Sequence, residues 1–124
     1  MPREPRAISI VDDDLSVRRA LRRLVRSAGY LVETFASAQE FLAAARWAAM
    51  GCLVLDVQMD GMSGFELQER LVSDRRAVPI IFITAHDDTR TRERIRTSGA
   101  AGYLGKPFDP QALLDAIHRV AGSP

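Results

Sequence analysis

The chain has 124 residues, of which 47% are hydrophobic and 27% are charged, and its formal net charge is +1. This length suits one compact domain and leaves too few residues for a second core, so we expect a single domain over 1–124, with its core at about 7–121 and a tail at 122–124. The near-neutral charge argues against a nucleic-acid-binding domain, and no apolar run approaches the roughly 20 residues that cross a bilayer.

Short apolar runs predict five β-strands, and helical patterns lie between them. In chain order, the expected strands are 8–11, 31–35, 52–55, 80–83 and 102–104. The expected helices are 15–28, 38–46, 64–73, 89–98 and 110–121. Buried parallel strands have continuous apolar sequences, and strict alternation of strands with helices is typical of an α/β fold with a parallel sheet.

Local signals mark several helix ends. Ser37 and Asp109 are predicted N-caps, Pro110 fits the first turn of the last helix, and Gly29 follows the first helix as a C-terminal cap would. The fourth helix is rich in arginine and has Ile95 as its only large aliphatic residue. One such side chain contributes about 1.5 to 3 kcal/mol on burial, so we expect this helix to be weakly held and easily displaced.

Polar groups follow four of the five predicted strands. The strands run into Asp12-Asp13-Asp14, Asp56, Thr84 and Gly105-Lys106-Pro107. In an open parallel sheet, ligands bind beyond the carboxyl ends of the strands, so these groups are expected to meet. Gathered carboxylates repel one another unless a cation lies among them, and Mg²⁺ takes oxygen ligands while leaving room for a phosphoryl oxygen.

Each of these residues also has an ordinary structural explanation. Asp14 is assigned to capping the first helix, but three successive aspartates exceed that need, so Asp12 and Asp13 are assigned to metal binding. Asp56 alone would be a turn residue, and Thr84 alone a common strand end. Lys106 is the only lysine beside sixteen arginines. The combination of all these groups favours phosphate and metal chemistry over the separate explanations.

Four short motifs carry a family resemblance. They are Ile10-Val11-Asp12-Asp13-Asp14, Leu55-Asp56-Val57-Gln58-Met59 with Met62-Ser63-Gly64, Thr84-Ala85, and Tyr103-Leu104-Gly105-Lys106-Pro107-Phe108. In order and spacing they resemble the CheY-like receiver domain of bacterial two-component response regulators. The resemblance covers essentially the whole chain. It implies a flavodoxin-like (βα)5 fold whose doubly wound, five-stranded parallel sheet has strand order 2-1-3-4-5.

The resemblance also implies a metal site and a phosphoacceptor. Asp13 and Asp56 would bind Mg²⁺ directly, with Mn²⁺ as an alternative ion, while Asp12 acts through water and the main-chain carbonyl of Gln58 completes the protein ligands. Asp56 would attack phosphorus and accept the phosphoryl group from a sensor histidine kinase, since a carboxylate can act as a nucleophile. The protein would then be a phosphoprotein and signalling switch and not a multiple-turnover enzyme. Residues 1–6 contain no apolar secretion segment, so a cytoplasmic location is expected.

Further roles follow from the same resemblance. Thr84 and Lys106 would contact phosphoryl oxygens, and Tyr103 would change rotamer as Thr84 is drawn inward. The fourth helix, fifth strand and fifth helix would form a signalling face that controls a partner or output domain and supports a homodimer, with transcription regulation as the expected output. The Lys106-Pro107 bond is expected to be cis.

The sequence departs from the family pattern in the loop that follows Asp56. The family usually has proline where this chain has Asp60, so we expect a loop that is looser or carries extra negative charge near the site. Gln58 and His86 occupy positions that influence how fast the acyl phosphate is hydrolysed, and the sequence does not give the size of their effect.

Two other functions remain as alternatives. A Mg²⁺-dependent phosphatase of the haloacid dehalogenase type also uses an aspartyl nucleophile, but it needs a second aspartate two residues later, where this chain has Gln58. A pseudo-receiver would bind a protein partner without being phosphorylated. The complete set of acids, threonine and lysine argues against that alternative.

Overall fold

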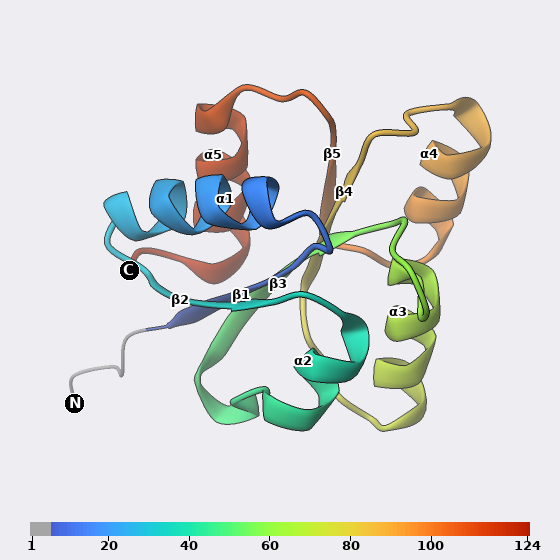
Figure 1. Cartoon of the computed structure of the whole chain (residues 1–124), viewed down its shortest axis with the longest axis horizontal. Coiled ribbons are helices and arrows are strands. Elements are labelled where there is room, and N and C mark those ends of the chain that lie inside the picture. Colours follow the sequence, from blue (N-terminus) through green and yellow to red (C-terminus); the bar gives the residue numbers. More distant parts are fainter. Residues whose placement is uncertain (1–5) are drawn as a thin grey trace.

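The computed structural model describes residues 6–124, which form a five-stranded parallel sheet with helices on both faces (Figure 1). The strands lie in the order β2-β1-β3-β4-β5, and every neighbouring pair is parallel. Their bounds are β1 Ala7–Val11, β2 Leu31–Phe35, β3 Met50–Asp56, β4 Ile80–Thr84 and β5 Gly102–Gly105. The predicted doubly wound fold and its strand order are confirmed.

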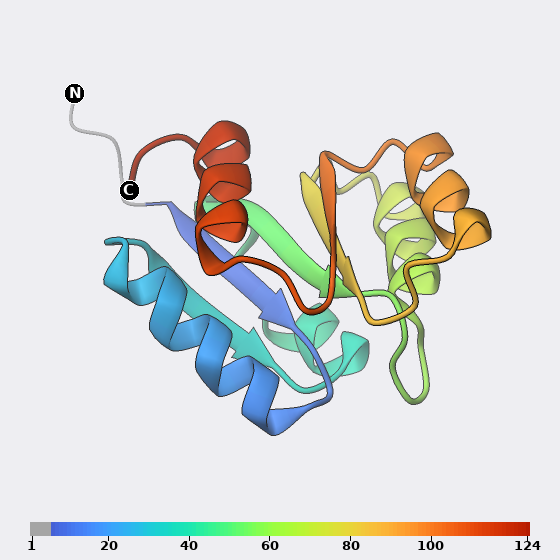
Figure 2. The ribbon, with the colours of Figure 1, turned by 90° about the horizontal axis from the view of Figure 1, so that it is seen from above.

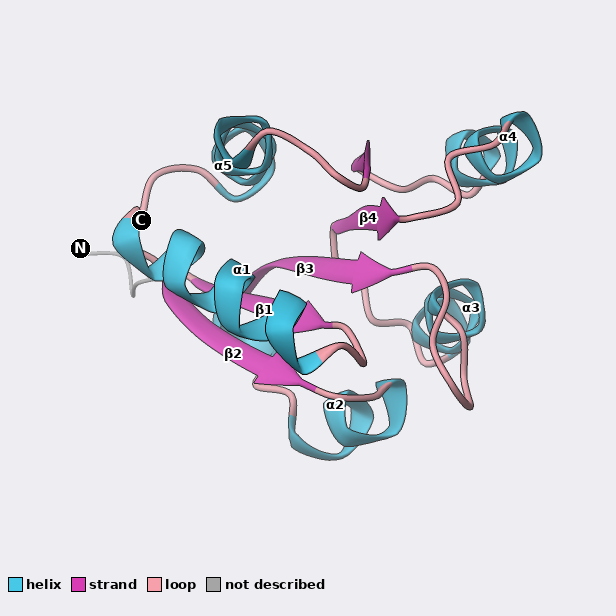
Figure 3. Ribbon diagram, turned by 45° about the horizontal axis from the view of Figure 1, so that its top comes forward, coloured by secondary structure: helices cyan, strands magenta, loops and turns pink. Residues whose placement is uncertain are grey.

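The helices cover the sheet in two layers. They are α1 Leu15–Ser27, α2 Ala38–Ala44, α3 Gly64–Ser73, α4 Thr89–Thr97 and α5 Pro110–Ala121, with a short 3-10 helix at Trp47–Ala49. Helices α1 and α5 lie on one face of the sheet, and α2, α3 and α4 lie on the other (Figures 2 and 3).

Alternation along the strands gives each face its own hydrophobic core. Successive side chains of a strand point to opposite faces. In β3, Cys52 and Val54 pack with α1 and α5, whereas Leu53 and Leu55 pack with α2, α3 and α4. Strands buried on both faces therefore favour apolar residues along their whole length, and β1, β3 and β4 are mostly apolar, with Ser9 as a buried exception inside β1.

Most helix-end predictions are confirmed. Asp14, Ser37 and Asp109 are N-caps whose side chains accept main-chain N–H bonds from the first turn of their helices. Gly29 follows the C-cap of α1 with φ of +100°, a conformation in which a side chain would be strained. Helix α4 buries Ile95 as predicted. Among residues 6–124, no helix combines the length and apolarity that a membrane span requires.

The predicted end of the second helix is wrong. Helix α2 stops at Ala44, and Ala45 is already extended, so the predicted range 38–46 is two residues too long. The chain turns here because Trp47 packs edge-on against Phe41, with ring centroids 5.3 Å apart. The intervening Arg46 has the non-helical φ of −98° and ψ of 86° that this turn needs.

The remaining differences are small. Strand β3 begins two residues before the predicted run and includes Asp56, which pairs with Ile83 of β4. Helices α1 and α4 each end one residue earlier than predicted, at Ser27 and Thr97. The strand order reverses between β1 and β3, and crevices for ligands form at the carboxyl ends of strands at such a reversal.

Candidate functional site

The carboxyl end of β1 places two aspartates in contrasting environments. Asp12 is fully buried, and its Oδ1 accepts the Asp14 N–H at 2.9 Å. Its main-chain carbonyl accepts a hydrogen bond from Arg18 Nη1 at 2.8 Å, which ties the strand end to α1. Asp13 is exposed at the rim. Asp14 accepts bonds from the first turn of α1, so its predicted role as a cap is confirmed.

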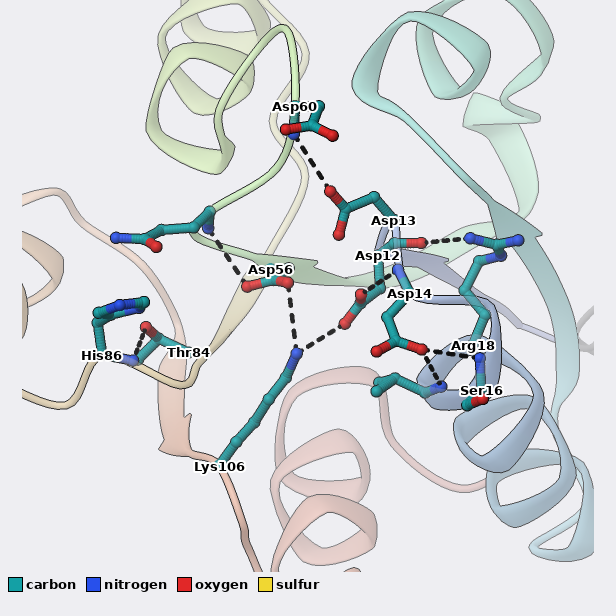
Figure 4. A network of polar contacts seen from close by, with 12 residues as sticks. Asp12, Asp13, Asp14, Ser16, Arg18, Asp56, Asp60, Thr84, His86 and Lys106 are labelled. Atoms are coloured by element: carbon teal, nitrogen blue, oxygen red, sulfur yellow. Dashed lines mark hydrogen bonds and ion pairs between the residues drawn. The ribbon is translucent and has the colours of Figure 1, made fainter.

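Asp56 ends β3 beside these acids. It is 7% exposed, and its Oδ1 accepts the Gln58 N–H at 3.3 Å (Figure 4). Burial is the main cause, and the negative charge of Asp12 the second, of a rise in the pKa of the Asp56 carboxyl from 3.8 to about 6, which the positive charge of Lys106 opposes. Burial and the charge of Asp12 thus make ionised Asp56 costly in the metal-free protein.

Lys106 joins the ends of β1 and β3. Its Nζ lies 2.9 Å from Asp12 Oδ2 and 3.3 Å from Asp56 Oδ2 (Figure 4). Burial on its own would lower the pKa of this ammonium group, but the hydrogen bond to Asp12 and the charges of Asp56 and Asp12 outweigh burial and raise the pKa. Lys106 is therefore a fixed positive charge between two acids.

The site has the composition of a divalent-cation site. Asp12, Asp13 and Asp56 each offer a carboxylate oxygen, and these oxygens lie within 4.8 Å of one another. With all three acids ionised, the Lys106 ammonium leaves two negative charges without a counterion. A hard divalent cation such as Mg²⁺ matches both the oxygen donors and the missing charge, so the residues present fit this ion.

Thr84 lies on the other side of Asp56 at the end of β4. It is fully buried, and its Oγ1 accepts the His86 N–H at 2.9 Å (Figure 4). The main-chain carbonyl of Thr84 accepts the Lys106 N–H at 2.7 Å, so strands β4 and β5 hold the two residues in register. The Lys106-Pro107 bond is cis, as predicted.

Tyr103 points toward the β4–α4 loop. Its hydroxyl donates to Asp87, which also pairs with Arg92 Nε of α4 at 3.4 Å. Burial, followed by the hydrogen bond and charge of Asp87, raises the pKa of the Tyr103 hydroxyl. Asp87 was not among the predicted site residues because an acid in a polar loop has no distinguishing local signal.

The loop between β3 and α3 borders the site. Asp13, Gln58, Met59, Asp60 and Ser63 line an open hollow of about 460 Å³. The Asp60 N–H donates to Asp13 Oδ2 at 3.2 Å, so a hydrogen bond holds this loop where the sequence suggested a looser one. The extra negative charge that the sequence suggested, that of Asp60, does lie beside the site. Gln58 and His86 are exposed.

Of the predicted site residues, the structure brings Asp12, Asp13, Asp56, Thr84 and Lys106 together at one edge of the sheet. Tyr103 and His86 lie beside this group, on β5 and on the β4–α4 loop. The predicted metal role of the Gln58 carbonyl and the predicted effects of Gln58 and His86 on hydrolysis stay predictions. Arg18 and the Asp60 N–H join the predicted set through their contacts with Asp12 and Asp13.

Comparisons with known proteins agree with this geometry. A sequence model of the response regulator receiver domain matches residues 8–118. Nodulation protein W of Bradyrhizobium diazoefficiens is 44% identical over 110 residues, which cover 89% of this chain and 48% of that protein. Response regulator protein TodT of Pseudomonas putida has the same identity and coverage. The chain thus spans about half the length of the curated relatives it matches.

Solved structures give the same result. The response regulator StyR superposes with a TM-score of 0.87 at 51% identity, covering 95% of this chain and 60% of StyR. The structure titled FixJ-N superposes with a TM-score of 0.86 at 34% identity, covering 96% of this chain and 95% of that one.

Proposed function

The chain belongs to the response regulator receiver family of two-component signalling, and we therefore propose that it is a switch controlled by phosphorylation of Asp56. Receiver domains of such systems have histidine kinases as partners in general. The observation that carries the proposal is the contact of one ammonium, Lys106 Nζ, with the carboxylates of both Asp12 and Asp56, beside the exposed acid Asp13.

Asp13 and Asp56 would hold Mg²⁺ directly, with Asp12 acting through water and the Gln58 carbonyl as a further ligand. Mn²⁺ is the alternative ion. When bound, the ion supplies positive charge that offsets the negative charge of the acids and of the incoming phosphoryl oxygens.

The chain's own residues account for the transfer step. A carboxylate oxygen of Asp56 forms a bond to phosphorus as the bond from phosphorus to the kinase histidine nitrogen breaks, and the imidazole leaves with that electron pair. Asp56 must be ionised to attack, and its pKa of about 6 leaves it mostly ionised above pH 7. Its burial keeps competing water away from the acyl phosphate.

Lys106 and Thr84 would contact the new phosphoryl group. Lys106 Nζ already contacts the Asp56 carboxylate and needs only a short movement to pair with a phosphoryl oxygen. Thr84 Oγ1 accepts a hydrogen bond from the main-chain N–H of His86, so its own hydroxyl hydrogen remains available for donation to a phosphoryl oxygen. Both groups stabilise charge without covalent participation.

Output would pass through Tyr103 and α4. A Thr84 side chain drawn toward the phosphoryl group frees space for Tyr103 to leave Asp87, and Asp87 also holds Arg92 of α4. Ile95 is the one large aliphatic residue of α4 and the one residue that this helix buries, so little burial energy opposes its displacement. The face formed by α4, β5 and α5 would then control a partner, a second receiver or an output domain.

The wider role rests on the relatives. Three of them are named transcriptional regulatory proteins: TdiR of Thauera aromatica, and FixJ of Bradyrhizobium diazoefficiens and of Azorhizobium caulinodans. We therefore propose transcription regulation as the output. A cytoplasmic location, a homodimer through α4, β5 and α5, and the lack of direct nucleic-acid binding by this domain stay predictions.

Intact-mass measurement after incubation with acetyl phosphate and Mg²⁺ tests the proposal. We expect one phosphoryl adduct per chain that is absent in Asp56→Asn and unchanged in the control Asp74→Asn, whose side chain is exposed at the end of α3. Rapid multiple turnover without an adduct would favour the phosphatase. No reaction at all would favour the pseudo-receiver.

A further inference from the structure

A single hydrogen bond links the two loops that border the candidate metal site. The main-chain N–H of Asp60, in the β3–α3 loop, donates to Asp13 Oδ2, after β1, at 3.2 Å (Figure 4). The two residues are 47 positions apart in the chain. A proline at position 60 has no N–H and could not make this bond.

This bond matters because the three acids are held unequally. Asp12 and Asp56 are buried and both contact Lys106. Asp13 is exposed, and within residues 6–124 the Asp60 N–H is the one hydrogen-bond partner of its carboxylate. Without it, the Asp13 side chain would be free to rotate into solvent, away from the two buried acids.

We propose that the Asp60 main-chain N–H is a positioning group for the divalent-cation site, and that it orients the Asp13 carboxylate toward Asp12 and Asp56. The proposal rests on the metal site of the proposed function. A carboxylate has two oxygens and about four lone-pair directions, so Asp13 can accept this bond and still bind a cation. Hydrogen-bonded partners of metal ligands typically change metal affinity by about 10- to 100-fold when removed.

The side chain of Asp60 makes a separate contribution. Asp60 lines the open hollow of about 460 Å³ together with Asp13, Gln58, Met59 and Ser63. The oxygens of Asp12, Asp13 and Asp56 lie within 4.8 Å of one another, and the Asp60 carboxylate does not belong to this group. The Asp60 side chain would therefore affect a bound cation through its charge and not as a ligand. Such an effect weakens as salt screens it, whereas the orientation of Asp13 by the N–H does not depend on salt in this way.

Three variants at one position separate the N–H from the charge. Asp60→Asn and Asp60→Ala keep the N–H and remove the charge, while Asp60→Pro removes both. Mg²⁺ affinity is measured by isothermal titration calorimetry on phosphate-free protein freed of metal with a chelator. We expect Asn and Ala to bind Mg²⁺ within about threefold of the wild type, with a difference that shrinks at high salt. Pro should bind about tenfold more weakly than Ala at every salt concentration.

The outcomes distinguish this inference from the proposed function. Equal Mg²⁺ affinity of Asp60→Pro and Asp60→Ala, with both folded by circular dichroism, would overturn the inference and leave the metal site standing. A wild type that binds no Mg²⁺ would overturn the metal site and the inference with it.

A second measurement does not depend on a proline in the loop. Asp13→Ala removes the acceptor, so the amide proton of residue 60 should shift upfield and exchange faster with solvent in nuclear magnetic resonance spectra. Asp74→Ala, far from this loop in the chain and at the end of α3, should leave that proton unchanged. An amide of residue 60 that is identical in the wild type and Asp13→Ala would show that the bond does not hold Asp13.

Discussion

Replacement of Asp56 by asparagine should stabilise the metal-free protein at neutral pH. The asparagine keeps nearly the same shape but carries no charge. Burial, followed by the charge of Asp12, raises the pKa of Asp56 from 3.8 to about 6. The folded protein therefore tolerates the ionised carboxylate less well than the unfolded chain does.

The magnitude follows from this pKa difference. One unit corresponds to about 1.4 kcal/mol, so a rise of about two units corresponds to roughly 3 kcal/mol. Between pH 3.8 and about 6 the folded protein retains a proton that the unfolded chain has lost. The free energy of unfolding of the wild type should therefore fall as pH rises through this window. Above about pH 6, Asp56 is ionised in both states and lowers this free energy no further. Asp56→Asn lacks this loss.

Urea unfolding followed by circular dichroism in a chelator, at a series of pH values from 4 to 8, measures the difference. The advantage of Asp56→Asn over the wild type should grow with pH and reach roughly 2 to 3 kcal/mol at neutral pH. Saturating Mg²⁺ should stabilise the wild type more than the variant and so reduce that advantage. A difference that is independent of pH, or a variant less stable than the wild type at pH 7.5, would show that the ionised Asp56 carboxylate does not destabilise the folded protein.

Three further predictions concern neighbouring groups. Displacement of α4 should speed its amide exchange when beryllofluoride binds, and Lys106→Arg should abolish this increase because it replaces a compact ammonium, 2.9 Å and 3.3 Å from two acids, with a planar guanidinium. Arg46→Lys, at an exposed position outside α4, β5 and α5, is the control, and an unchanged response in Lys106→Arg would contradict the role of Lys106. Asp87→Asn should lower the pKa of one tyrosine, Tyr103, toward 10.0 while Tyr30 stays raised, and an unchanged spectrophotometric titration would count against the Asp87 contact. Gly64→Ala should lower the free energy of unfolding, measured by thermal denaturation, by about 1 to 3 kcal/mol and should slow phosphorylation, because a Cβ there overlaps the main-chain oxygen of Asp56. An alanine variant with wild-type stability and phosphorylation rate would disprove this clash.

Much of the fold follows from local sequence. The strands are buried on both faces, so runs such as Ile80–Thr84 contain almost no polar residue and are easy to recognise. The clustering of Asp12, Asp56, Thr84 and Lys106 follows from the rule that parallel strands place their carboxyl ends at one edge of the sheet.

Other features have no local signal. The end of α2 is set by the packing of Trp47 on Phe41, which outweighs the helix-forming tendency of the alanines before it. The bond from the Asp60 N–H to Asp13 joins two loops far apart in the chain, and its donor is a main-chain group that every residue except proline provides. Such contacts depend on how whole loops are placed.

A crystal structure of the protein with Mg²⁺ and beryllofluoride would show directly whether Asp56 is the phosphoacceptor beside a divalent-cation site. We expect the beryllium on a carboxylate oxygen of Asp56, the cation in contact with Asp13 and Asp56, and the fluorines in contact with Lys106 Nζ and Thr84 Oγ1. Beryllofluoride on another carboxylate, or a cation bound away from Asp13 and Asp56, would contradict this expectation.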